Sequence, residues 1–134
     1  KGVEKMNMEA VEKQVYKVIG KHIYANMDQI DERYLGNMDL LTKLVNESAR
    51  IGRLHIVEMS AKKFAPLNGY DGGVSIIAIL EESHIALHTW PESNYATLDI
   101  YTCGASSDPE AAFNYIVQKL KPKDIKVFRA DRGN

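Results

Sequence analysis

The residues best suited to chemistry lie close together in the second half of the chain. One segment runs Glu82-Ser83-His84-Ile85-Ala86-Leu87-His88-Thr89-Trp90-Pro91-Glu92, and Cys103, the only cysteine, follows it. Serine, histidine, carboxylate and thiol groups therefore fall within about twenty residues, and such groups serve as nucleophiles, bases and proton donors in enzymes. This segment is the first candidate for an active site.

The series resembles the self-cleavage and active-site block of the prokaryotic, pyruvoyl-dependent S-adenosylmethionine decarboxylase family. The resemblance extends from Val18 to Arg132, with matches at Gly73-Val74-Ser75 before the block and at Asp108-Pro109 after it. Glu82-Ser83-His84 alone is a weak signal, but the whole series at this spacing is a strong one.

The resemblance implies a cofactor made from the chain itself. In the family the chain cuts itself between the residues that match Glu82 and Ser83, and the serine becomes a covalent pyruvoyl group. The single domain of residues 1–134 would then become a β chain, 1–82, and an α chain, 83–134. The pyruvoyl ketone forms a Schiff base with the substrate amine and accepts the electrons left by CO₂ loss. The alternative for Ser83 is an ordinary water-exposed serine at a strand end.

The resemblance also assigns roles to three further side chains. His88 is the base of the processing step, Ser75 assists processing, and Cys103 donates a proton to the product carbanion. A thiol suits this last task because its ordinary pKa lies near neutrality. The alternatives are a half-buried strand histidine, a locally bonded strand serine and a small buried cysteine.

Strand alternation adds a geometric expectation. In a regular strand His84, His88 and Trp90 share one face, and Ser83 points to the other. We therefore expect the junction between Glu82 and Ser83 to be bent, as befits a strained scissile peptide.

The substrate pocket is assigned by resemblance to Phe64, Trp90 and Glu92, which match family residues that pack against the substrate or hold its polar end. Trp90 could instead belong to the core, and Glu92 could be a solvated charge at a turn.

The first strand departs from the family pattern, because residues 23–30 lack its acid and its cysteine. The loop before Ser75 is also longer than usual, by about five residues. These features are similar to an archaeal branch that decarboxylates L-arginine, so we favour arginine decarboxylation to agmatine in polyamine biosynthesis. A carboxylate must then receive the guanidinium, and the candidates are Asp28, Asp71 and Glu92.

Three alternatives remain open. The chain could decarboxylate S-adenosylmethionine for spermidine synthesis. It could be a non-catalytic regulatory paralogue, although such a protein is expected to have lost Ser83, His88 or Cys103, and all three are present. It could also be a small ligand-binding α+β domain.

Composition limits the partners and the setting. The chain has 134 residues, 45% hydrophobic and 26% charged, with a net charge of -1, which suits one globular domain and gives no pull toward nucleic acid or membrane. A single cysteine favours a reducing, cytoplasmic setting. We expect no metal site, because His22, His55, His84 and His88 show no familiar ligand spacing with Cys103.

The pattern along the chain predicts the elements that position these residues. We expect frayed residues at the start, to about residue 12. Strands are expected at 16–26, 54–60, 74–80, 84–90, 95–101 and 125–129, with a loop at 64–73. Asn37 caps a helix over 38–51, which Gly52 ends, and Asp108 caps a second helix from Pro109.

The helices should bury one stripe each. The expected stripe residues are Leu40, Leu41, Leu44, Val45 and Ser48 in the first helix, and Ala112, Phe113, Ile116, Val117 and Leu120 in the second.

Two halves, βαββ and ββαβ, indicate an α+β sandwich, with both helices on one face of an antiparallel sheet. Residues 74–80 are apolar on both sides, so the open sheet face predicts a homodimer or higher homo-oligomer.

Overall fold

The computed structural model describes residues 18–133 of the chain. The strands are β1 (Gly20–Asp28), β2 (Ile56–Lys63), β3 (Val74–Leu80), β4 (Ser83–Trp90), β5 (Tyr95–Cys103) and β6 (Asp124–Arg132). The helices are α1 (Glu32–Leu35), α2 (Met38–Ile51) and α3 (Pro109–Leu120), with a 3-10 turn at Pro91–Ser93. The expectation for residues 1–12, and the start of the first strand at Tyr16, lie outside the described residues.

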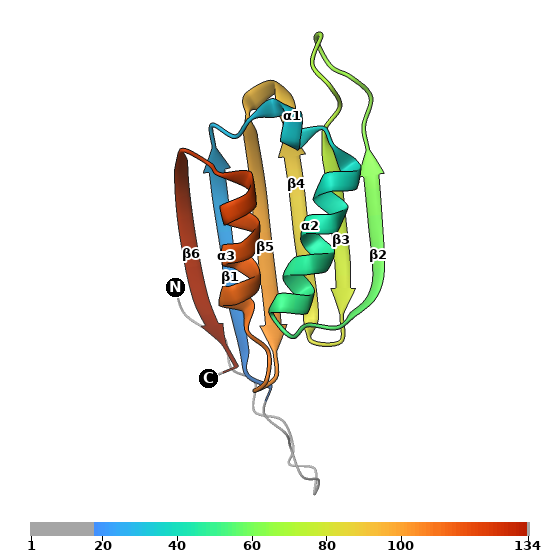
Figure 1. Cartoon of the computed structure of the whole chain (residues 1–134). Helices are drawn as coiled ribbons and strands as arrows, with labels where there is room; N and C mark the ends of the chain where they lie inside the picture. Colours follow the sequence, from blue (N-terminus) through green and yellow to red (C-terminus); the bar gives the residue numbers. More distant parts are fainter. Residues whose placement is uncertain (1–17, 134) are drawn as a thin grey trace, which may run out of the picture.

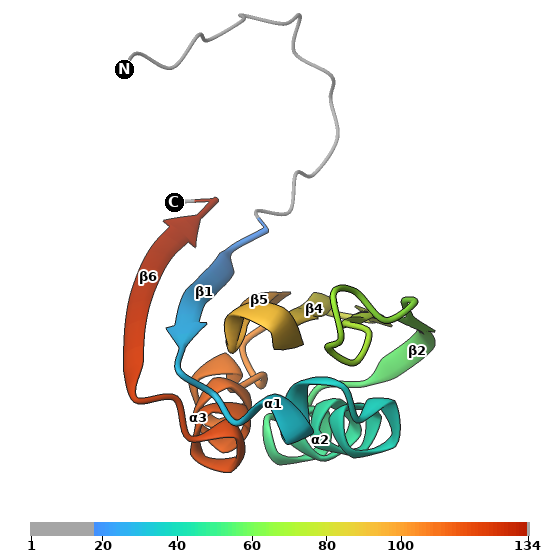
Figure 2. The same cartoon turned by 90° about the horizontal axis from the view of Figure 1, so that it is seen from above.

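The strands form one six-stranded antiparallel sheet in the order β2-β3-β4-β5-β1-β6 (Figure 1). All three helices lie against one face of this sheet, and no described element covers the other, which we call the open face (Figure 2). The predicted α+β sandwich is therefore confirmed, with α1 and α2 in the first half of the chain and α3 in the second. No helix in residues 18–133 is long and apolar enough to cross a membrane.

Local signals fix both long helices. The Asn37 side chain accepts the Leu40 amide at 3.0 Å, and the amide of Gly52 donates to Ser48 O at the other end of α2. Asp108 caps α3 by accepting the Ala111 amide at 3.1 Å. Such caps satisfy amides that have no partner within the helix.

The expected stripes are confirmed in most positions. Leu40 and Val117 lie only half-buried, and Ala49 is buried in α2 although it was not expected. The core forms between these stripes and every second residue of the strands, as in β4, where Ile85, Leu87 and Thr89 are buried.

Two differences from the predicted elements have local causes. β2 begins at Ile56 instead of Leu54, because the Leu54 amide donates to Ala49 O at 2.8 Å and still belongs to the end of α2. α1 was not predicted, since it has only four residues and depends on Asp31, whose side chain accepts the Arg33 amide. The prediction of strand at Val18 and Ile19 is wrong, because β1 begins at Gly20, and β1, β2, β4, β5 and β6 each extend past one or both of their expected limits.

A buried hydroxyl joins three segments at the end of the sheet where β4 finishes. Thr89 is 5% exposed, and its Oγ1 donates to Leu35 O at 2.6 Å while it accepts the Val74 amide at 2.9 Å. At Gly73 a Cβ would clash with the Thr89 carbonyl oxygen. Thr89 therefore holds the end of the loop over residues 64–73 against β4.

We expect Thr89→Val to lower the free energy of unfolding by about 1–3 kcal/mol, because it leaves the buried Leu35 carbonyl and Val74 amide without their partner. Urea unfolding of the two proteins measures this difference. Thr42→Val, at a half-exposed position of α2, is the matched control and should stay within about 0.5 kcal/mol of the parent. Equal losses in both variants would contradict the role of Thr89.

Candidate active site

Ser75 and His88 form a pair on the open face. They lie directly opposite each other on β3 and β4, and Ser75 Oγ is 2.8 Å from His88 Nδ1. A hydrogen bond at Nδ1 orients the imidazole and directs Nε2 to a different partner. The pair thus has the geometry of an oriented base.

A cavity of about 350 Å³ surrounds this pair. Besides the candidate carboxylate Asp71, its walls include five residues that the resemblance singled out for processing or substrate binding: Phe64, Ser75, His88, Trp90 and Glu92. The Trp90 ring centroid lies 6.4 Å from that of His88. Phe64 follows the end of β2 and begins the long loop at one end of the sheet (Figure 1). The structure therefore brings these five predicted residues together.

The three candidate carboxylates differ in their surroundings. Asp71 lines the cavity, but its Oδ1 is 2.9 Å from Lys63 Nζ, and this contact, with the Gly72 amide, holds the pKa of Asp71 below its usual range. Glu92 lines the same cavity. Asp28 ends β1, on the far side of β5 from Trp90, and is not among the residues that line the cavity.

The predicted cleavage point lies at the opposite end of β4. Glu81 and Glu82 form the turn between β3 and β4, and Ser83 pairs with Leu80 on one side and Thr102 on the other. Ser83 has a φ of 148°, a conformation that non-glycine residues rarely adopt. The Glu82 carbonyl accepts the Cys103 amide at 2.9 Å. The expected bend at the Glu82-Ser83 junction is therefore present.

Cys103 ends β5 beside this turn. Its side chain is half-buried and lines a second cavity of about 490 Å³, between the residues at the start of β1 and the end of β5 with the loop after it. Cys103 is thus close in the fold to the predicted cleavage point and distant from the cavity around His88.

Ser83 and His88 do not meet within one chain. They are five residues apart on one extended strand, which spans roughly 17 Å at about 3.3 Å per residue. The candidate site therefore has two parts: Glu82, Ser83 and Cys103 at one end of the sheet, and the cavity around Ser75 and His88 at the other.

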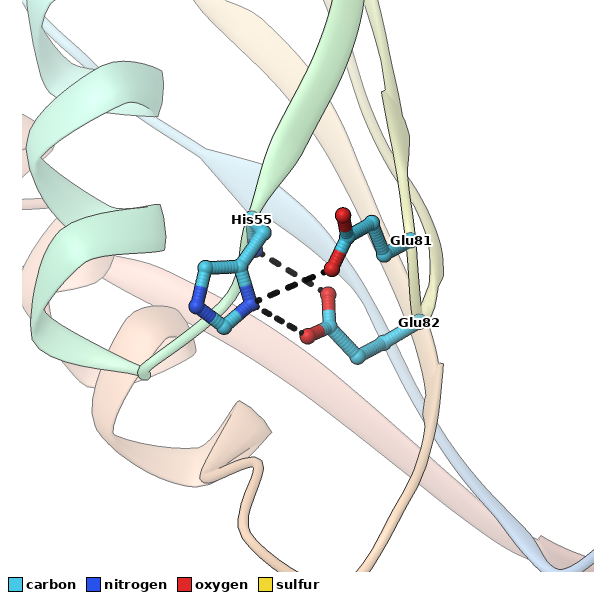
Figure 3. A group of neighbouring side chains, drawn as sticks. All are labelled: His55, Glu81 and Glu82. Carbon is cyan, nitrogen blue, oxygen red and sulfur yellow. Dashed lines mark hydrogen bonds and ion pairs between the residues drawn. The ribbon is translucent and has the colours of Figure 1, made fainter.

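Sequence reasoning did not find two polar clusters. On the open face, Asp99 Oδ1 is 2.9 Å from His22 Nε2 and 3.4 Å from His84 Nε2, so residues of three neighbouring strands meet. Beside the turn, His55 contacts Glu81 and Glu82 (Figure 3). Both clusters depend on strand pairing between distant residues, which the sequence pattern does not reveal.

The ligand atoms of His55, Glu81 and Glu82 lie within 4.8 Å of one another, as a divalent cation would need. Here His55 Nδ1 is hydrogen-bonded to Glu82 Oε2 at 2.7 Å, and Glu81 Oε1 is 3.8 Å from the same nitrogen. The absence of a metal site stays a prediction.

The fold and the order of these residues define a class of decarboxylase. The solved adenosylmethionine decarboxylase from Aquifex aeolicus VF5 matches the structure with a TM-score of 0.79 and 31% identity, over 89% of this chain and 94% of that one. Residues 21–133 match the model of the S-adenosylmethionine decarboxylase family. The chain belongs to this family and is a decarboxylase.

A relative in Hyperthermus butylicus is named arginine decarboxylase proenzyme. It is 50% identical over 117 residues, which are 87% of this chain and 80% of the relative.

The strained φ at Ser83 leads to a stability prediction. Neither Ser83→Gly nor Ser83→Ala retains the hydroxyl, so we expect both chains to stay intact. Glycine adopts a φ of 148° without a Cβ penalty, so Ser83→Gly should be the more stable by about 1–3 kcal/mol. Urea unfolding of the two uncut proteins measures this difference. A more stable alanine variant would show that the junction carries no strain.

Proposed function

We propose that the protein is a self-processing, pyruvoyl-dependent arginine decarboxylase that converts L-arginine to agmatine and CO₂. The observation that carries this substrate is the 50% identity to the arginine decarboxylase proenzyme over 87% of the chain. The structural relative favours S-adenosylmethionine as the second candidate. The single cysteine favours a reducing, cytoplasmic setting.

In this proposal, one domain of residues 1–134 cuts itself into 1–82 and 83–134. Ser83 Oγ attacks the Glu82 carbonyl carbon and loses its proton, the C–N bond breaks, and the freed nitrogen takes up a proton. A base then removes the Ser83 Cα proton while the Cβ–Oγ bond breaks, which releases the main-chain carboxylate of Glu82 as the new C-terminus. The dehydroalanine left at position 83 tautomerises to an imine. Water hydrolyses this imine, the nitrogen leaves as ammonia, and the ketone of the pyruvoyl group remains.

The geometry of the turn fits this chemistry. The Cys103 amide already donates to the carbonyl oxygen that would become negative during attack, the arrangement of an oxyanion hole. The unusual φ of Ser83 stores strain that cleavage relieves.

When formed, the pyruvoyl group would supply the electron sink for loss of CO₂. Cys103, beside the same turn, would return a proton to the product. In the cavity, Glu92 would receive the guanidinium bidentately, and Trp90 and Phe64 would cover its faces. Asp71 is already paired with Lys63, so Asp28 remains the other candidate carboxylate, although it does not line the cavity.

The two halves of the site would meet in a homodimer. Several large apolar side chains of the open face are exposed to solvent in the single chain, which is unusual for a stable monomer. Their exposed fractions range from 39% to 48%, and the residues are Tyr24, Ile77, Ile79, Trp90 and Phe128. The open faces of two copies can pack together around a two-fold axis that lies between them, perpendicular to the strands. This axis reverses the strand direction, so the Ser83 end of β4 in one copy lies against the His88 end in the other. His88 of one copy would then act on Ser83 of its partner.

The purified protein should consist of two fragments and should decarboxylate arginine in preference to S-adenosylmethionine. Denaturing mass spectrometry identifies fragments 1–82 and 83–134, and release of labelled CO₂ from each substrate measures the preference. Glu92→Gln should lower kcat/KM for arginine about tenfold to hundredfold, since it removes a charge-assisted pair.

The matched variant Asp28→Asn separates the two candidate carboxylates. If kcat/KM for arginine falls only in Asp28→Asn, the guanidinium is bound by Asp28 on β1 and not by Glu92. Efficient turnover of S-adenosylmethionine without turnover of arginine would replace the proposed substrate by the second candidate.

Co-expression of two inactive chains tests the shared site. Neither Ser83→Ala nor His88→Ala should be cut when it is expressed alone. In a mixed dimer the His88→Ala chain has an intact Ser83 that faces the partner's His88, so mass spectrometry should find that chain cut. Pairing it with a Ser83→Ala, His88→Ala double variant is the control. Cleavage of wild type without any in the mixed dimer would refute the shared site.

A further inference from the structure

His55 makes a set of contacts with the turn that carries the cleavage point. It lies just before β2, and its carbonyl accepts the Glu81 amide at 2.9 Å. Its own amide donates to Glu82 Oε1 at 3.0 Å, and its Nδ1 is 2.7 Å from Glu82 Oε2 (Figure 3). One residue thus binds both carboxylate oxygens of Glu82.

These contacts hold the Glu82 side chain in one place. The side chain is only 16% exposed, whereas that of Glu81, the other residue of the turn, is 68% exposed. Glu81 Oε1 approaches His55 Nδ1 only to 3.8 Å. The imidazole therefore binds Glu82, the residue that contributes the carbonyl of the scissile peptide, and contacts Glu81 much less closely.

The charges favour the same arrangement. Burial opposes ionisation of Glu82, but the hydrogen bonds from the His55 amide and imidazole outweigh it and keep the pKa of Glu82 below its usual range. The hydrogen bond to Glu82, together with the Glu82 and Glu81 charges, raises the pKa of His55. An ionised Glu82 only accepts hydrogen bonds, so His55 Nδ1 is the donor.

We propose that His55 is a positioning residue for self-cleavage, which acts by fixing the Glu82 carboxylate and, through it, the orientation of the Glu82-Ser83 peptide. This inference rests on the proposed self-processing. A short turn can rotate its peptide planes, and attack requires Ser83 Oγ near the Glu82 carbonyl carbon in a narrow range of directions. His55 anchors Glu82 by its side chain, and the Cys103 amide anchors it by its carbonyl oxygen. With both ends held, the peptide plane keeps the orientation that attack needs.

Pulse-chase labelling of newly made chains measures the cleavage rate directly. His55→Ala removes the imidazole and keeps the backbone contact, so we expect cleavage to slow about threefold to tenfold. His55→Asn should restore most of the rate, because its side-chain amide can donate from the position of Nδ1. Arg50→Ala, which removes a similarly exposed basic side chain paired with Glu47 on α2, is the control and should cleave as wild type does.

A double-variant cycle tests whether His55 acts through Glu82. Glu82→Ala alone should slow cleavage, and adding His55→Ala to it should cause no further loss. Unfolding of the same variants in a Ser83→Ala background, where no chain is cut, separates loss of positioning from loss of stability.

The outcomes separate two failures. Equal cleavage rates in wild type and His55→Ala, additive effects with Glu82→Ala, or a rate loss matched by the Arg50→Ala control would overturn the role of His55 alone. A wild-type chain that is never cut would overturn the proposed self-processing, and the role of His55 with it.

Discussion

The rigidity of an extended strand is the constraint on which the candidate site depends. β4 carries Ser83 at its first position and His88 five residues later, and its pairing with β3 and β5 on both sides holds it straight. No side-chain rotation closes a gap of roughly 17 Å. A chain that uses both residues in one reaction must therefore bring in a second copy, and the exposed apolar side chains of the open face give that copy a surface to bind.

The alternation of strand residues keeps the core and the chemistry apart. Buried residues of β4 and β5, such as Ile85, Leu87 and Leu98, point toward the helices. Their neighbours His84, His88 and Asp99 point to the open face, where they contact other polar groups. Substitutions on the open face can therefore alter binding and catalysis with little effect on the packing that stabilises the domain.

Much of the fold could be predicted from local signals. β3 has the predicted limits because its apolar run lies between Gly72-Gly73 and the charged pair Glu81-Glu82, and both long helices begin at the predicted caps. The resemblance to the family singled out Phe64, Ser75, His88, Trp90 and Glu92, and the structure brings them together around the first cavity. Their assigned roles belong to the proposal.

The remaining features depend on long-range geometry. The contact of His55 with Glu82 follows from the register of β2 on β3, which includes a bulge between Ile56 and Glu58. The cluster of His22, Asp99 and His84 requires the strand order β4-β5-β1, in which β1 lies far from its neighbours in sequence. Hydrophobic periodicity carries no information about either relation.

Position 103 combines two roles that evolution can change independently. Its main-chain amide binds the Glu82 carbonyl oxygen, and every residue except proline has such an amide. Its thiol is specific to cysteine and, under the proposed mechanism, serves only turnover. A descendant of this protein could thus lose its proton donor and still mature into two chains, which gives duplicated copies a route to cleaved but inactive partners.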